Sequence, residues 1–148
     1  MYKVVRLSTI LIIFMLTACN QYKPMDYTKS VQGLESEQII EYYFSAWNEK
    51  DYEKMNAVLS DEMKAMTIDY DSINTVEIIS CDLVSAEDLP VVIDRLVEAA
   101  TYKVVAKYYQ NEDPEQDNIS TAYYYTGKDT ENSPRLIYYV ENDTRENP

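Results

Sequence analysis

The sequence contains no histidine, only two glycines and only two cysteines among its 148 residues. Without histidine, the chain lacks the commonest zinc ligand and the base of Ser-His and Cys-His catalytic arrangements. Gly33 and Gly127 stand far apart, so no glycine-rich phosphate loop is present. We therefore expect neither a metal nor a cofactor, and no nucleophilic dyad or triad.

The first 18 residues have the composition of a secretory signal. Lys3 and Arg6 belong to a short basic segment without acids, and an almost wholly apolar run follows at residues 7–16. A membrane-spanning helix takes about 20 apolar residues, so this run is too short to span a bilayer and fits the central region of a signal peptide. We predict that residues 1–18 are removed on export.

The apolar run ends in Leu16-Thr17-Ala18-Cys19. This motif resembles the lipobox of bacterial lipoproteins, in which an aliphatic residue and two small residues precede a cysteine. The resemblance implies a diacylglyceryl thioether on Cys19, cleavage before Cys19 and often acylation of the new amino group. Two acyl chains anchor a protein stably. We expect a protein anchored by lipid to the extracytoplasmic face of a cell membrane; the alternatives are an ordinary signal peptide with an incidental cysteine, or an uncleaved helix.

The chain is strongly acidic, with a formal net charge of −13, and removal of Lys3 and Arg6 with the signal leaves −15. This charge repels nucleic acid and anionic lipid headgroups, so we exclude a nucleic-acid partner. Residues 19–148 suffice for one domain with its own core. Once Cys19 carries lipid, Cys81 has no disulfide partner, and we expect it to be a small buried hydrophobe.

The hydrophobic pattern predicts helices in the first half of the domain. Residues 19–33 are polar and form a tether. Residues 36–48 are predicted to be a helix that Ser36 caps, with one apolar stripe formed by Ile39, Ile40, Tyr43, Phe44 and Trp47. Asp51 is predicted to cap a second helix, which Ser60-Asp61-Glu62 ends or redirects.

The second half is rich in predicted strands, at residues 75–83, 101–110, 120–126 and 135–141. The last three strands have short polar connections and are typical of an antiparallel meander. A short helix is predicted between the first two strands, from Pro90 to Ala100, because its apolar residues repeat at helical spacing. The domain is thus placed at residues 34–141, with a polar tail at 142–148.

Residues 39–63 (IIEYYFSAWNEKDYEKMNAVLSDEM) resemble the opening of nuclear-transport-factor-2-like domains, a group that includes ketosteroid-isomerase-like and polyketide-cyclase-like proteins. The similarity consists of an aromatic first helix, an acidic turn and a second helix that leads to Ser60-Asp61. It implies an α+β fold in which a curved antiparallel sheet packs on two or three N-terminal helices as a cone. Together with the lipobox, the chain resembles a family of bacterial lipoproteins that carry such a domain.

The resemblance also implies a pocket between the sheet and the helices. Its candidate lining residues are Tyr43, Trp47, Asp69, Tyr70, Asp71, Tyr102 and Tyr108. In enzymes of this group an acid–base residue lies in the pocket, and a buried aspartate beside a tyrosine donor would move a proton. The sequence matches no such arrangement residue by residue. The aromatic residues fit a core equally well, and the aspartates fit a solvent-facing turn.

Fifteen tyrosines occur, many of them in adjacent positions of the predicted strands. Side chains alternate along a strand, so tyrosines must lie on both faces of the sheet. We predict that the face without helices exposes Tyr109, Tyr124 and one of Tyr138 or Tyr139. Such a row suits a homodimer contact or an envelope protein partner, although cross-strand tyrosine pairs also stabilise a sheet by themselves.

The sequence thus favours a lipid-anchored, non-enzymatic domain that binds a ligand or a protein outside the cytoplasm. The alternative is a small-molecule enzyme of the isomerase or cyclase type. That enzyme would use a carboxylate in the cone, with Asp51, Asp69 and Asp71 as the candidates.

Overall fold

Helices precede strands in the part of the chain that the computed structural model describes, residues 31–66, 70–85, 94–110 and 118–143. The elements are α1 (Ser36–Asn48), α2 (Tyr52–Ala57), α3 (Asp61–Lys64), β1 (Ile73–Leu83), β2 (Val97–Gln110), β3 (Asn118–Lys128) and β4 (Leu136–Asn142). The strands form one antiparallel sheet in the order β1-β2-β3-β4. The predicted meander is therefore confirmed and includes β1.

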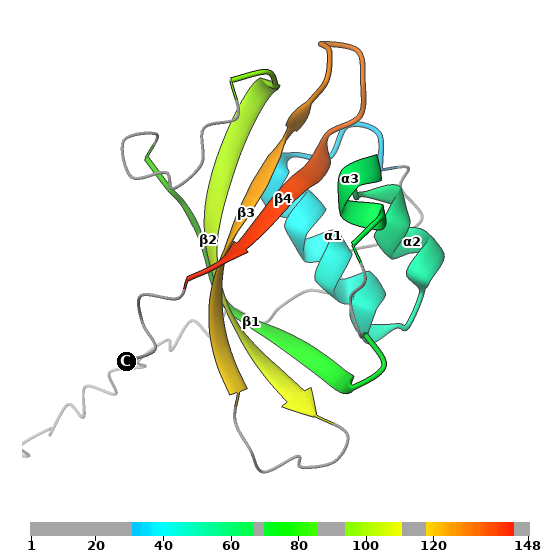
Figure 1. The fold of residues 1–148 in the computed structure, drawn as a ribbon, viewed down its shortest axis with the longest axis vertical. Coiled ribbons are helices and arrows are strands. Elements are labelled where there is room, and N and C mark those ends of the chain that lie inside the picture. The colour runs from blue at the N-terminus through cyan, green and yellow to red at the C-terminus, as the bar shows by residue number, and fades with distance from the viewer. Residues whose placement is uncertain (1–30, 67–69, 86–93, 111–117, 144–148) are drawn as a thin grey trace, which may run out of the picture.

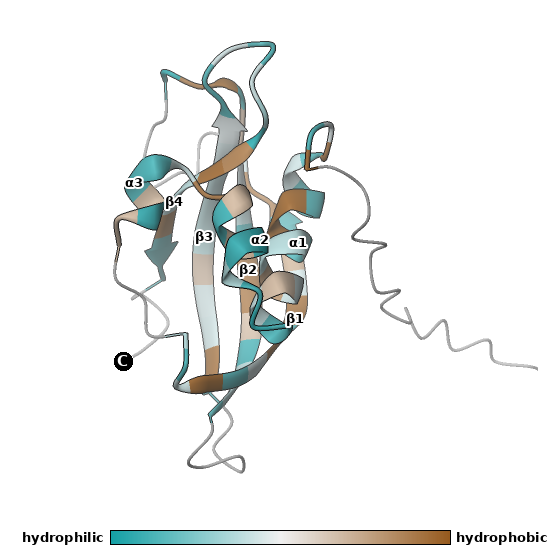
Figure 2. Ribbon diagram, turned by 90° about the vertical axis from the view of Figure 1, so that its right-hand side faces the viewer, coloured by the Kyte–Doolittle hydropathy of each residue, from teal (hydrophilic) through white to brown (hydrophobic). Residues whose placement is uncertain are grey.

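The three helices cover one face of the curved sheet (Figure 1; Figure 2). The apolar stripe of α1 is buried, and its Ile39, Ile40 and Phe44 are at most 1% exposed. They belong to one core with Val104 and Ala106 of β2 and with other residues of the sheet. Burial of each large apolar side chain contributes about 1.5–3 kcal/mol. The predicted α+β architecture is confirmed, and its shape is consistent with the nuclear-transport-factor-2-like cone.

Side-chain caps define where the helices begin. Glu35, rather than Ser36, caps α1, and its backbone N–H donates to Gln38 at 2.9 Å in a capping box. Asp51 caps α2 as predicted, because its carboxylate accepts from the backbone N–H of Lys54 at 3.1 Å. Ser60 caps the additional short helix α3. The predicted cap at Ser36 was wrong because its hydroxyl instead accepts from a buried arginine described below.

The helix predicted between the first two strands is wrong at its C-terminal end. Val97 and Ala100 belong to β2, where they pair with Lys128 and Thr126 of β3. A register shift lies between these two pairs, and Glu98 has a positive φ of 52° there. Ladder hydrogen bonds therefore override the helical spacing of a short apolar segment. Residues 86–93, the rest of the predicted helix, lie outside the described residues.

The two faces of the sheet differ from the prediction at one tyrosine. Tyr124 pairs with Tyr102 on the helix-covered face, is 4% exposed and lies 5.5 Å from the Phe44 ring. Its place in an exposed row is therefore wrong, because three consecutive tyrosines do not reveal which of them points at the helices. Tyr109 and Tyr139 lie on the face without helices, and Tyr139 is 39% exposed.

Candidate functional site

Aromatic side chains gather around Trp47, near the C-terminal end of α1. The indole is 6% exposed. The Tyr70 ring meets it edge-on with ring centroids 4.8 Å apart, and the ring of Tyr108 from β2 lies at 6.0 Å. Tyr43, one helical turn before Trp47, lies at 5.9 Å. We call these four residues and Tyr124, whose ring is 6.3 Å from that of Tyr43, the cone-end cluster.

Hydroxyl groups connect the tyrosines of the cone-end cluster. The hydroxyl oxygens of Tyr43 and Tyr70 lie 3.2 Å apart, and the hydroxyls of Tyr108 and Tyr124 are hydrogen-bonded to each other. Burial is the main cause that raises the pKa of Tyr43, Tyr108 and Tyr124 above the ordinary tyrosine value. These three phenols therefore stay protonated and uncharged at neutral pH.

Trp47 supplies the one feature of the cluster that a filled core does not explain. Its indole Nε1 is buried and has no hydrogen-bond partner. Buried indole N–H groups usually find a partner, because leaving such a donor unsatisfied costs about 1–3 kcal/mol. A molecule that offers an acceptor atom at this position would remove that cost.

Tyr70 begins a segment, residues 70–73, that residues of the turn after α1 and the start of α2 hold in place through hydrogen bonds. Lys50 donates through Nζ to the carbonyl oxygens of Tyr70, at 3.3 Å, and Ile73. The Tyr52 hydroxyl donates to the carboxylate of Asp71. Lys50 has a positive φ of 57°, a backbone conformation that is costly for a side chain other than glycine and that is retained where surrounding contacts hold it.

The carboxylates proposed for acid–base chemistry do not enter this cluster. Asp51 caps α2, and the backbone N–H of Lys54 is the largest cause that lowers its pKa. Asp71 is exposed and accepts from Tyr52. Asp69 lies outside the described residues. Among the residues that the structure describes, none of the fully buried polar side chains is an aspartate or glutamate. The arrangement offers neutral hydrogen-bond donors rather than a buried base.

Tyr102 is the predicted pocket residue that lies beside the cone-end cluster, because it pairs with Tyr124 across the β2–β3 ladder. It lies on the same face of β2 as Tyr108, but six residues away, which corresponds to about 20 Å along a strand. Burial and then the nearby charge of Glu37 raise its pKa. Cys81 is a free, half-buried thiol opposite Val104, and burial raises its pKa to about 12, so it is a poor nucleophile.

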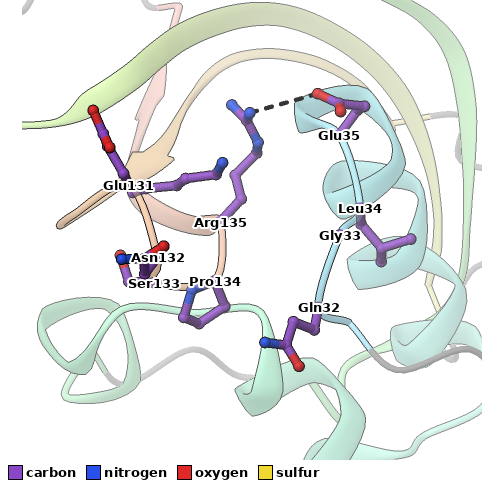
Figure 3. Close-up of a pocket in the computed structure, with 10 residues that line it drawn as sticks. Gln32, Gly33, Leu34, Glu35, Glu131, Asn132, Ser133, Pro134 and Arg135 are labelled. Carbon is purple, nitrogen blue, oxygen red and sulfur yellow. Dashed lines mark hydrogen bonds and ion pairs between the residues drawn. The ribbon is translucent and has the colours of Figure 1, made fainter.

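A hollow of 180 Å³ lies between residues 32–35 and the β3–β4 connection (Figure 3). Arg135 lines it and is only 7% exposed. Its guanidinium donates to the Ser36 hydroxyl and to the Glu98 carbonyl, both at 2.9 Å, and pairs with the Glu98 carboxylate. The sequence did not predict this cluster, although Arg135, a single cation at the start of the apolar strand 135–141, was a signal that a buried charge needs partners.

The charges around Arg135 are already matched. Lys128 lies 2.8 Å from the Glu98 carboxylate, and Glu35 lies 3.5 Å from Arg135. The hydrogen bond from Lys128, followed by the charges of Lys128 and Arg135, lowers the pKa of Glu98. Because its cations are neutralised within the protein, this hollow joins α1 to the β3–β4 hairpin rather than offering free charge to a ligand.

Comparison with known protein families matches residues 37–143 to the family described as Domain of unknown function (DUF4829). The chain belongs to this family. The match extends from the first turn of α1 to the residue after β4, so the DUF4829 domain contains the whole cone-end cluster and Arg135, whereas Ser36 and Glu35, two partners of Arg135, lie just before the match. No curated protein and no solved structure matches the chain.

Of the helices in the described ranges, none combines the length and the apolar character that crossing a membrane requires. Over the same ranges, the side chains form no group of three or more histidine, cysteine, aspartate or glutamate residues that would hold a metal ion.

Proposed function

We propose that this protein is a lipoprotein anchored through Cys19 on the extracytoplasmic face of a cell membrane. Its DUF4829 domain binds a small uncharged molecule at the cone-end cluster without catalysing a reaction. One observation carries the binding proposal, namely the buried indole N–H of Trp47, which has no partner although the rings of three tyrosines contact the indole.

The chemistry of the cluster supports an uncharged ligand. Tyr43, Tyr108 and Tyr124 remain protonated, and the contacts of the indole of Trp47 are with aromatic rings, which would leave the charge of a buried ligand unpaired. The negative net charge of the domain also disfavours anions. The ligand that fits is therefore planar and apolar in its body, with an oxygen that accepts from Trp47.

The anchor supports the placement of the domain. Residues 20–30 connect Cys19 to the first described residue, and eleven extended residues span at most about 40 Å. This tether keeps the domain near the membrane, while the charge of −15 disfavours contact with anionic headgroups. The domain would thus bind its ligand in the aqueous layer beside the membrane.

The anchor is tested by the substitution Cys19→Ser. We expect the variant to lose labelled fatty acid and to leave the membrane fraction, because serine lacks the thiolate that receives the lipid. The measurement is metabolic labelling with a fatty acid, followed by fractionation. A variant that still carries label and still sediments with membranes would contradict the anchor.

Binding is tested by the substitution Trp47→Phe, which removes the indole N–H and keeps an aromatic ring. We expect native mass spectrometry of the gently purified lipoprotein to show a bound small molecule that the variant loses. Tyr109→Phe, on the other face of the sheet, serves as the control and retains the molecule. Identical spectra of the unliganded protein for all three forms would contradict a ligand at the cone-end cluster.

A further inference from the structure

We infer that residues 70–72 form a latch and that the Tyr70 ring occupies the place of the ligand against Trp47. The inference rests on the proposed function and names the class of ligand, an uncharged phenol-sized ring with a hydroxyl or carbonyl oxygen. Binding then requires that the latch open and that the ligand replace Tyr70.

Tyr70 makes the contacts that such a ligand would make. Its ring meets the indole edge-on at 4.8 Å, and its hydroxyl lies 3.2 Å from that of Tyr43. It nevertheless leaves the Trp47 Nε1 without a partner. A free ring that is not tied to the backbone can shift until an oxygen accepts from this N–H, so it satisfies one more donor than Tyr70 does.

The position of Tyr70 in the chain allows it to leave. The residue is only partly buried and lies between α3 and β1, before the first residue of the sheet. Its displacement therefore breaks no hydrogen bond of the β1–β2 ladder, which begins at Ile73. The other members of the cluster belong to α1, β2 and β3, which keep the walls of the site in place.

Polar side chains of the turn after α1 hold the latch closed. The hydrogen bond from Tyr52 to Asp71 is exposed, and the Tyr52 side chain is 40% exposed. Lys50 donates part-buried hydrogen bonds to the carbonyl oxygens of Tyr70 and of Ile73, the first residue of β1. Each such hydrogen bond contributes about 0.5–1.5 kcal/mol net, so the latch opens at a small cost compared with unfolding of the domain.

This arrangement makes the affinity depend on the open population. The apparent dissociation constant equals the intrinsic constant divided by the fraction of molecules that are open. Tyr52→Phe removes the hydroxyl that donates to Asp71 but leaves all five residues of the cone-end cluster unchanged. We expect this substitution to tighten binding about fivefold, which corresponds to the loss of one ordinary hydrogen bond from the closed state.

The experiment uses the full lipoprotein in detergent and p-cresol as the probe, since p-cresol is the side chain of tyrosine as a free molecule. Calorimetric titration, corrected for the micelles, gives the affinity. Trp47 is the only tryptophan of the chain, so acrylamide quenching of its fluorescence reports opening of the latch directly. Tyr109→Phe is the matched control, because it removes a tyrosine–carboxylate hydrogen bond, to Glu77 at 2.8 Å, on the opposite face.

We expect Tyr52→Phe, and likewise Asp71→Asn, to increase quenching and to tighten p-cresol binding, whereas Tyr109→Phe matches the wild type. Equal affinity and equal quenching in all four forms would overturn the latch and leave the proposed ligand site intact. If none of the forms binds p-cresol while native mass spectrometry still shows a ligand, the phenol class is wrong. If neither method detects binding, the proposed function fails together with the latch.

Discussion

Arg135 shows how a single residue joins parts of the chain that are far apart. Its guanidinium contacts Ser36 and the Glu98 carbonyl, about 100 and 37 positions away in the sequence. A buried cation is tolerated only when charges and acceptors surround it, and both are present here. We therefore interpret Arg135 as the residue that fixes the start of α1 against the β3–β4 hairpin.

At this scale we predict that Arg135→Met lowers the free energy of unfolding by about 2–3 kcal/mol, because two acceptors and a carboxylate lose their donor. Denaturant unfolding of the variant and the wild type measures the difference. Lys54→Met, which breaks exposed ion pairs with Glu49 and Asp51, is the control and should have a smaller effect. Equal losses in the two variants would contradict the structural role of Arg135.

The difference in unfolding free energy between wild type and Arg135→Met should also depend on pH. The pKa of Glu98 is lowered in the folded protein, so its contribution to stability is present above the unfolded value near 4.5 and is lost as the pH falls through the folded pKa. The stability difference between wild type and Arg135→Met should therefore narrow in acid below that value.

At the scale of elements, periodicity predicted α1 well and the start of β2 poorly. Residues 36–48 carry an apolar stripe long enough to indicate one period, and the helix ends where this pattern ends, at Asn48. The segment 92–100 is short, and the spacing of its apolar residues fits both a helix and a strand. Hydrogen bonds to β3 decide between them, and these partners lie about 30 positions further along the chain.

The helix caps also divide into one set by the local sequence and one set by a tertiary contact. Asp51 caps the helix that begins one residue later, so its role is local and was predictable. Ser36 was an equally good local candidate, but Arg135 engages its hydroxyl and Glu35 takes over the cap. A tertiary hydrogen bond thus moved the cap by one position.

At the scale of the whole molecule, the helices cover one face of the sheet, and no helix of the described residues packs on the other face (Figure 1; Figure 2). Tyr139 and Ile119 are exposed there, at 39% and 59%. Tyr109 is half-buried and donates to Glu77. Tyrosines of this kind suit an interface, because the ring is apolar and the hydroxyl tolerates water. We propose that this face makes the homodimer or the contact with an envelope protein.

We predict that the double substitution of Tyr109 and Tyr139 by serine preserves the fold and weakens association by at least about tenfold, since aromatic side chains commonly dominate interfaces. Sedimentation velocity measures the association, and circular dichroism checks the fold. Replacement of exposed Tyr52 by serine, on the helical side, provides the control for loss of a surface tyrosine. Unchanged sedimentation of the double variant would count against this face as a self-association surface.

The sequence by itself determined the α+β class, the helix α1 and the meander, because each depends on residues that are neighbours in the chain. It also grouped Tyr43, Trp47, Tyr70 and Tyr108 as candidates for one site, and the fold brings these four together. Only the tertiary structure decided that Tyr124 faces the helices, that Tyr102 pairs with it and that Arg135 is buried. These outcomes depend on strand register and on partners up to 100 positions away, and such contacts leave no periodic trace in the sequence.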